Sequence, residues 1–226
     1  MATFDSLQKD ILHCKKCPRL VSWREETAIT KVRRFSEEQY WGKPVPGFGD
    51  THAEILLVGL APAAHGANRT GRMFTGDESG KWLYRALYKA GFSNKILSLY
   101  RDDELVLKNV YITATCRCAP PQNKPTKEEI NNCRRFILEE FRLLKNLRII
   151  IGLGKIGFDA AFDCAKESAL TELNQRPKFS HGAITHLNAN LILIGSYHPS
   201  QQNTFTGKLT ELMFNSIFKK AKIQIK

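Results

Sequence analysis

The stretch from Glu54 to Asp77 reads EILLVGLAPAAHGANRTGRMFTGD, and it decides the fold. It starts as a short apolar run and continues into a long turn of small residues. Such a run, bounded by glycine and proline, is typical of a strand that is covered on both faces. Because open α/β sheets bind ligands at the carboxyl ends of their strands, this turn predicts a ligand site.

Apolar runs and amphipathic segments alternate along the rest of the chain. The predicted strands are Glu54–Leu60, Asn109–Thr115, Leu147–Leu153 and Leu191–Tyr197, and the predicted helices are Ser79–Ala90, Glu128–Leu144 and Leu209–Ala221. Thr126 followed by Glu129 forms a capping-box signature before the second helix. The alternation predicts an α/β fold with a parallel sheet and helices on both of its sides.

The chain of 226 residues suits one domain and contains no internal repeat. We expect residues 1–226 to form a single domain that begins with a cluster-binding segment. The segment Glu25–Asp50 is rich in glycine and proline towards its end, and it is predicted to be a long irregular loop.

The amino-acid composition indicates which class of partner the protein binds. The formal net charge is +12, which favours a polyanion such as nucleic acid, although a generically basic protein fits the charge equally well. No apolar run reaches membrane-spanning length, and the N-terminus lacks a signal-peptide pattern, so we expect a cytoplasmic protein with no membrane partner. We also expect a monomer.

Five of the six cysteines gather in two regions of the sequence. Cys14 and Cys17 form a CxxC pair, whereas Cys116, Cys118 and Cys133 lie far along the chain. A CxxC pair with two distant cysteines fits a four-thiolate site for zinc or an iron–sulfur cluster, and the spacing does not choose between them. Cys133 also fits a buried core thiol.

Two polar loops carry the candidate chemistry. The turn after the first strand contains Arg69 and Arg72, which can bind phosphate, and Phe74, which offers a stacking face. It contains neither a GxxxxGK[ST] nor a GxGxxG pattern, so its generic signal is weak. The fourth strand leads into HPSQQNTFTGKLT, which begins at His198. A lone histidine is more often structural, yet this loop can also hold amides and hydroxyls against phosphates.

Together these stretches resemble the uracil-DNA glycosylase superfamily, and within it the iron–sulfur branch called family five. GLAPAAHGANRTGRMFTGD resembles the first family motif and HPSQQNTFTGKLT the second. The resemblance implies a three-layer α/β/α sandwich with a four-stranded parallel sheet. It also implies a 4Fe–4S cluster on Cys14, Cys17, Cys118 and Cys133, because the family ligand directly precedes the Ala-Pro-Pro turn. Cys116 is therefore left out, and Cys164 is predicted to be a core thiol.

The resemblance also implies a monofunctional DNA glycosylase of base excision repair. It would flip uracil, or another deaminated or damaged base, out of double- or single-stranded DNA and hydrolyse the bond to the sugar. Phe74 would stack on the base, His198 would donate a hydrogen bond to it, and the loop Pro199–Lys208 would enter the minor groove. The remaining implied residues are Gly59, Leu60, Ala61 and Ala63 along the base pocket, and Arg69, Arg72, Ser200, Asn203 and Lys208 against DNA.

Two departures bear on mechanism and selectivity. Other branches have an acidic residue where this chain reads Gly59-Leu60-Ala61-Pro62. Water would then be held by Asp77 or Asn68, or formation of the sugar cation would need little help. Asp77 fits an ordinary helix N-cap equally well. Ala114 stands where many relatives have an asparagine that recognises uracil, which predicts a broad range including other damaged pyrimidines and hypoxanthine.

Two other classes of protein share part of this pattern. A non-catalytic iron–sulfur nucleic-acid-binding protein would have the same charge and cysteines, but it would not need His198 beside a pocket with Phe74. A zinc-stabilised α/β nucleotide hydrolase is disfavoured by the missing phosphate loop and by the few carboxylates in the motifs.

Overall fold

The computed structural model describes residues 3–225. The helices are α1 (Phe4–Leu12), α2 (Pro18–Thr30), α3 (Ala67–Thr70), α4 (Glu78–Ala90), α5 (Lys127–Leu143), α6 (Gly154–Glu167), α7 (Gln201–Phe205) and α8 (Glu211–Gln224), with short 3₁₀ turns η1 (Arg33–Phe35) and η2 (Pro121–Asn123). The strands are β1 (Phe48–Gly49), β2 (Ile55–Gly59), β3 (Val110–Ala114), β4 (Ile149–Leu153), β5 (Ile184–His186) and β6 (Ile192–Ser196).

The strands form one sheet in the order β1-β3-β2-β4-β6-β5. The four central strands are parallel, as predicted, and all their residues are buried. The predicted number of four strands is wrong, because β1 and β5 add antiparallel edges. These edge strands have two and three residues, so they leave no apolar run in the sequence.

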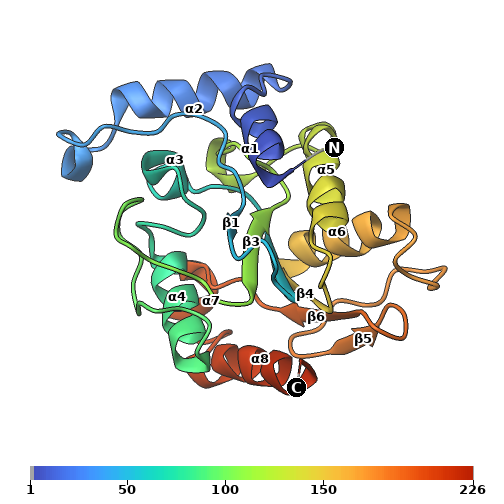
Figure 1. Cartoon of the computed structure of the whole chain (residues 1–226). Coiled ribbons are helices and arrows are strands. Elements are labelled where there is room, and N and C mark those ends of the chain that lie inside the picture. Colours follow the sequence, from blue (N-terminus) through green and yellow to red (C-terminus); the bar gives the residue numbers. More distant parts are fainter. Residues whose placement is uncertain (1–2, 226) are drawn as a thin grey trace.

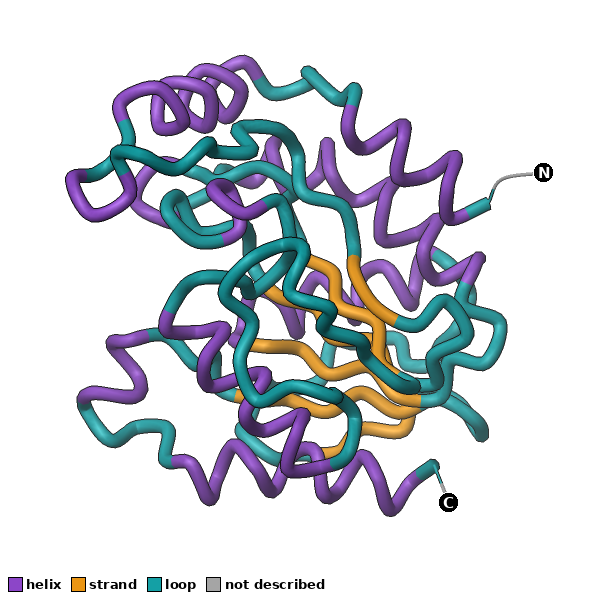
Figure 2. Tube along the Cα trace, turned by 60° about the vertical axis from the view of Figure 1, so that its left-hand side comes forward, coloured by secondary structure: helices purple, strands orange, loops and turns teal. Residues whose placement is uncertain are grey.

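Helices cover both faces of the sheet, which confirms the α/β class (Figure 1). Alternate strand residues such as Leu57 and Ile151 pack against α4 and α8. Their neighbours, including Leu56 and Ile150, pack against α5 and α6. Figure 2 shows the strands as one central layer between these helices. Within residues 3–225, no helix is both long and apolar enough to cross a membrane.

The N-terminal helices lie beyond the carboxyl end of β3 (Figure 1). The prediction of an irregular segment from Glu25 is partly wrong, since α2 continues to Thr30. Helix α2 begins with Pro18 in its first turn, which favours a helix start, but its weak amphipathic pattern hid it from the sequence analysis. Helix α1 was not predicted either, although a capping box at Thr3 begins it and its apolar residues Leu7 and Ile11 lie buried on one face.

The predicted helix over Glu128–Leu144 is confirmed as α5 with one-residue shifts at each end. The Thr126 side chain accepts from the backbone of Glu129, and the Glu129 side chain accepts from the backbone of Thr126. This capping box fixes the start of the helix that carries Cys133. The predicted helices after the first and fourth strands are likewise confirmed as α4 and α8.

Candidate active site

The first motif and the second meet at the carboxyl edge of the sheet. Gly59 and Ala114 end adjacent strands and are partners in the β2–β3 ladder. The Phe74 and His198 rings lie near them, with centroids 5.9 Å apart and planes inclined by 30°. A Cβ atom on Gly59 would lie only 3.1 Å from the Phe74 ring, so the glycine makes room for it. The structure therefore brings four of the predicted base-site residues together.

Phe74 has an unusual backbone conformation for a bulky residue. Its φ of 56° lies in the left-handed region, which non-glycine residues rarely adopt. The neighbours enforce it: the buried Tyr84 hydroxyl donates to the Met73 carbonyl at 2.8 Å, and Gly80 leaves the space that the Phe74 carbonyl fills. Strain held in this way is common at binding sites, where it fixes a side chain before the ligand arrives.

His198 follows β6, and its imidazole is in a poorly solvated position. Burial lowers the pKa of His198 to about 4, and no charged partner contributes to that shift. Its carbonyl accepts from the Asn203 side chain at 2.8 Å. Gly154, with φ of 81°, lies close behind it, since a Cβ there would sit 3.3 Å from the His198 Cβ. The ring is therefore neutral at pH 7, and the backbone that carries it is held by Asn203 and packed against Gly154.

Asp77 caps α4 and also faces the first motif. One of its oxygens accepts from the Gly80 amide at 2.8 Å. The other lies so close to Gly66 that any side chain there would collide with it. Burial raises the pKa of Asp77, and the amide of Gly80 opposes the shift. The capping role is thus present, while the second oxygen is turned towards the motif.

Asn68, the other residue predicted to hold water, is bonded to the N-terminal helices. Its side chain is fully buried, and its amide donates to the Arg24 carbonyl of α2 at 3.2 Å. Its side-chain oxygen has no hydrogen-bond partner among residues 3–225. This arrangement joins the first motif to the N-terminal helices, and it gives Asn68 a structural contact that the sequence did not suggest.

The predicted phosphate contacts of Arg69 and Arg72 are not supported. Both guanidinium groups are buried and bind within the protein. Arg69 pairs with Glu38 and donates to the His65 carbonyl, whereas Arg72 pairs with Asp103 at 2.5 Å. Buried guanidinium groups that are already paired cannot turn outward without losing those partners. Both arginines instead hold the loops around the turn.

The loop after His198 divides into inward and outward residues. Asn203, predicted to contact DNA, donates to His198 instead and braces the loop. Ser200 begins α7 and is half-buried, while Lys208 is exposed with its amine 5.1 Å from the Tyr197 ring centroid. Phe205 is 79% exposed, which is unusual for so large an apolar side chain. Ser200, Phe205 and Lys208 therefore remain available to a partner.

The other predicted pocket residues continue the turn. Leu60, Ala61 and Ala63 are half-buried directly after β2. The Leu60 carbonyl accepts from the Cys116 amide at 2.9 Å, and the Ala63 carbonyl accepts from Gly66 and Asn68. The turn is therefore ordered by its own backbone, and it is tied to the segment that carries the cysteines.

The four predicted cluster ligands come from the N-terminal segment, the loop after β3 and helix α5, and their charges influence one another. All six cysteines are free thiols, and within residues 3–225 no three histidine, cysteine or acidic side chains are grouped as a formed metal site. Burial raises the pKa of Cys118, and the charges of Cys133 and Cys14 add to that shift, which places these thiols within electrostatic reach. Cys116, which was left out of the ligand set, is fully buried and hydrogen-bonds to Cys133.

Each of these four thiols also has an N–H donor, as the thiolates of an iron–sulfur cluster commonly do. The donors are Arg24 to Cys118 at 2.9 Å, Asn132 to Cys17 at 3.5 Å, Arg135 to Cys14 at 3.8 Å, and the Arg117 backbone to Cys133. Arg24 is 2% exposed and its Nε has no partner among the described residues. A buried cation of this kind suits an anionic group, so the residues fit a cluster of four thiolates. No sequence signal had pointed to Arg24.

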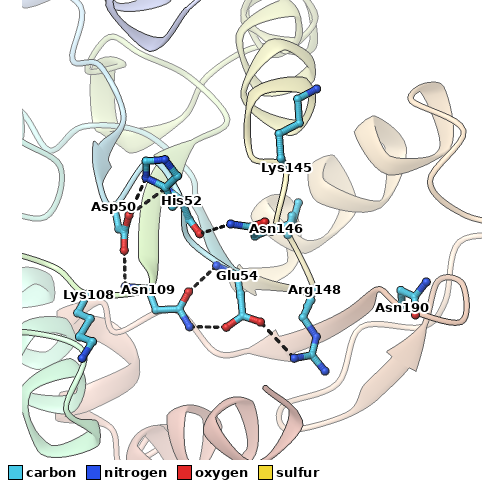
Figure 3. A pocket seen from close by; sticks show the side chains of 10 residues that line it. Asp50, His52, Glu54, Lys108, Asn109, Lys145, Asn146, Arg148 and Asn190 are labelled. Carbon is cyan, nitrogen blue, oxygen red and sulfur yellow. Dashed lines mark hydrogen bonds and ion pairs between the residues drawn. The ribbon is translucent and has the colours of Figure 1, made fainter. Parts of the chain in front are cut away.

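A large hollow of about 730 Å³ lies at the opposite, amino edge of the sheet (Figure 3). Its polar groups pair with one another: Glu54 accepts from Asn109 at 2.7 Å and from Arg148 at 3.1 Å. Lys108 and Lys145 extend away from this network. The hydrogen bonds and the ion pair around the hollow therefore connect segments of the chain, and they leave Glu54 paired and not free for a ligand.

Comparisons with known proteins identify the family of this chain. A family model described as the uracil DNA glycosylase superfamily matches residues 46–222. The chain therefore belongs to the uracil-DNA glycosylase superfamily.

Individual relatives indicate to which group within the superfamily the chain is similar. The type-5 uracil-DNA glycosylase of Thermus thermophilus is 50% identical over 92% of each chain. Proteins of the same name from Mycobacterium leprae and Pyrobaculum aerophilum are 48% and 40% identical over 96% of this chain, and over 93% and 92% of their own lengths. Within the superfamily, the chain is thus similar to the type-5 group.

Proposed function

We propose that this protein is a monofunctional uracil-DNA glycosylase, which hydrolyses the bond between uracil and deoxyribose to leave free uracil and an abasic site. The observation that carries the proposal is the Phe74–His198 pair, 5.9 Å apart at the carboxyl edge of the sheet. A base extruded from DNA needs a stacking face and a donor at one place.

Phe74 and His198 would share the work on the base. The Phe74 ring is preset by its backbone and stacks on the extruded base. The neutral His198 imidazole donates an N–H to the carbonyl oxygen on which negative charge develops as the bond breaks. A neutral donor suits this task because it keeps its proton, and burial holds the pKa of His198 far below neutrality.

Asp77 would place the attacking water. Its first oxygen serves the cap of α4, and its second faces the Gly66 turn, where the sugar of the extruded nucleotide would lie. An ionised Asp77 would also stabilise the positive charge that develops on the sugar. Asn68 does not enter this proposal, because its amide is bonded to Arg24.

The loop around α7 would hold the DNA. Ser200 and Lys208 contact phosphates, and the exposed Phe205 ring lies against the bases in the minor groove. Apolar side chains inserted between base steps unstack them, which favours extrusion of a neighbouring nucleotide. The net charge of +12 supports binding to either single- or double-stranded DNA.

Selectivity for uracil would be relaxed. Ala114 ends β3 beside Gly59, and its methyl group has no amide with which to test the edge of the base. A pocket without that hydrogen bond rejects other bases less strongly. We therefore include other deaminated or damaged bases, hypoxanthine among them, in the substrate range.

A 4Fe–4S cluster would be held by Cys14, Cys17, Cys118 and Cys133. Such a group, when bound, would shape the surface that meets DNA and would take no part in the bond cleavage. Arg24 links this region to the first motif, because its side chain donates to Cys118 and its carbonyl accepts from Asn68. We also propose a single domain over residues 1–226, a monomeric state, and a cytoplasmic location, where reduced thiols persist.

The proposal is tested by incubating the protein with a duplex that contains one uracil and then cleaving abasic sites with alkali. Strand scission at the uracil is expected, and scission should also follow with hypoxanthine. Binding without scission on any modified base would favour a non-catalytic nucleic-acid-binding protein. Absorbance near 400 nm in the purified protein tests the cluster separately, and a colourless, zinc-containing protein would contradict it.

A further inference from the structure

Beyond the paired residues of β5 and β6, the hydrogen bonding between these two segments continues and ends at a histidine side chain. The ladder is extended by two backbone bonds, from Gly195 to the Ala183 carbonyl at 3.1 Å and from Gly182 to the Gly195 carbonyl at 2.7 Å. The next amide of this edge, that of Tyr197, has no strand opposite. It donates instead to Nδ1 of the His181 side chain at 3.0 Å.

The His181 ring is held in the position that this bond requires. It stacks on the Tyr197 ring with centroids 5.0 Å apart and planes inclined by 24°. Because Nδ1 accepts, the proton of the neutral ring must be on Nε2. Burial lowers the pKa of His181, which keeps the ring in this neutral form. A protonated His181 ring would place its own Nδ1–H against the Tyr197 N–H, and this hydrogen bond would be lost.

This bond lies one residue from the proposed donor of the active site. Tyr197 precedes His198, and the carbonyl on the other side, that of His198 itself, accepts from Asn203 at 2.8 Å. The Ser196 hydroxyl donates to the Tyr197 carbonyl at 3.0 Å. The backbone that carries the imidazole is therefore fixed both before and after it.

We infer that His181 is a positioning residue for His198: its ring extends the β5–β6 ladder by one bond and thereby sets where the His198 imidazole meets the base. The inference rests on the proposed role of His198. A hydrogen-bond donor contributes to catalysis only if it is aimed at the oxygen that gains charge, so small displacements of this backbone cost rate. Binding of DNA, which uses the outer face of the α7 loop, does not depend on the bond.

Two substitutions separate the acceptor from the ring. His181→Asn places an oxygen near the position of Nδ1, whereas His181→Phe keeps the stacking on Tyr197 and removes the acceptor. His186→Asn, on the exposed end of β5, is the matched control. The measurements are the single-turnover rate of uracil excision at saturating enzyme, the Kd for uncleaved duplex, and the thermal midpoint.

We expect His181→Phe to lower the excision rate about tenfold with a Kd within about twofold of the wild type. His181→Asn should restore most of the rate, and His186→Asn should leave it unchanged. An unchanged rate in the Phe variant overturns the inference, as does an equal loss in both variants, since that would make His181 merely structural.

A measurement on the unmodified protein keeps the inference testable if the Phe variant does not fold. The Tyr197 amide should exchange with solvent slowly in the wild type, because among residues 3–225 its acceptor is the His181 ring. Fast exchange overturns the inference. An active wild type with an unaffected Phe variant overturns the inference alone, whereas a wild type inactive on every damaged base overturns the proposed function and the inference with it.

Discussion

The two edges of the central sheet are built from the same strands and carry opposite chemistry. At the amino edge, the polar side chains of Glu54, Asn109 and Arg148 satisfy one another around the large hollow (Figure 3). At the carboxyl edge, Asp77 and His198 are desolvated, and burial shifts the pKa of each towards its neutral form. The size of a hollow is thus a poor guide to function in this protein, whereas desolvated groups without full pairing mark the site.

The largest expected effect is loss of rate at the carboxyl edge. His198→Ala should lower the single-turnover excision rate about 10²–10³-fold, which corresponds to roughly 2.7–4 kcal/mol, because one donor to the developing anion is removed. The measurement is alkaline cleavage of a uracil-containing duplex over time. A rate equal to that of the wild type would remove His198 from the mechanism and would leave the two edges chemically alike.

Asp77→Asn separates catalysis from capping, since asparagine caps helices as well as aspartate does. We expect the excision rate to fall about 10²-fold if the carboxylate places the water. The raised pKa means that Asp77 stabilises the fold fully below its ordinary value of 3.8 and that this contribution is lost as pH rises through the raised pKa. At pH 7 the variant should therefore unfold at the same urea concentration as the wild type, or a higher one.

Cys14→Ser tests whether the carboxyl edge depends on the N-terminal segment. The variant should lose most of its absorbance near 400 nm and bind DNA more weakly. Cys164→Ser, which changes a buried thiol on α6, is the control and should keep the full absorbance. Full absorbance in the Cys14 variant would assign that ligand to another residue, with Cys116 the nearest candidate.

The burial of His198 at the carboxyl edge can also be tested through stability at two pH values, with no measurement of the excision rate. The lowered pKa of His198 means that the unfolded chain binds a proton between pH 6.5 and about 4 that the folded chain does not. The stabilising contribution is thus fully present above pH 6.5 and is lost as pH falls towards 4. Urea unfolding at pH 7 and pH 4.5 should show a smaller difference in His198→Gln than in the wild type.

The smallest effect is expected at the amino edge. Glu54→Gln should lower the free energy of unfolding by about 1 kcal/mol, because the partly exposed bonds to Asn109 and Arg148 are weakened. The excision rate should stay within about twofold of the wild type. A large loss of excision in this variant would show that the two edges are coupled and not separate.

The sequence predicted the parts of the molecule that rest on local pattern. The four buried strands and the helices α4, α5 and α8 have strong periodicity, and a capping box marks the start of α5. The edge strands β1 and β5 escaped notice because their pairing is set by the neighbouring strand and not by their own residues. The contacts of Arg69, Arg72 and Asn203 could not be predicted either, because they depend on how the loops fold. The two arginines pair with residues distant in the sequence, and Asn203 is turned inward by its loop.

The left-handed backbone of Phe74 has a consequence for how this enzyme diversifies. Few residues tolerate such a φ, and the carbonyl packed against Gly80 leaves no slack for adjustment. A substitution at Phe74 must therefore suit this backbone as well as the stacking, whereas Ala114 lies on a regular strand, where a larger side chain meets only the packing around a buried position. Variation in lesion choice among descendants of this chain should accumulate at the strand and spare Phe74.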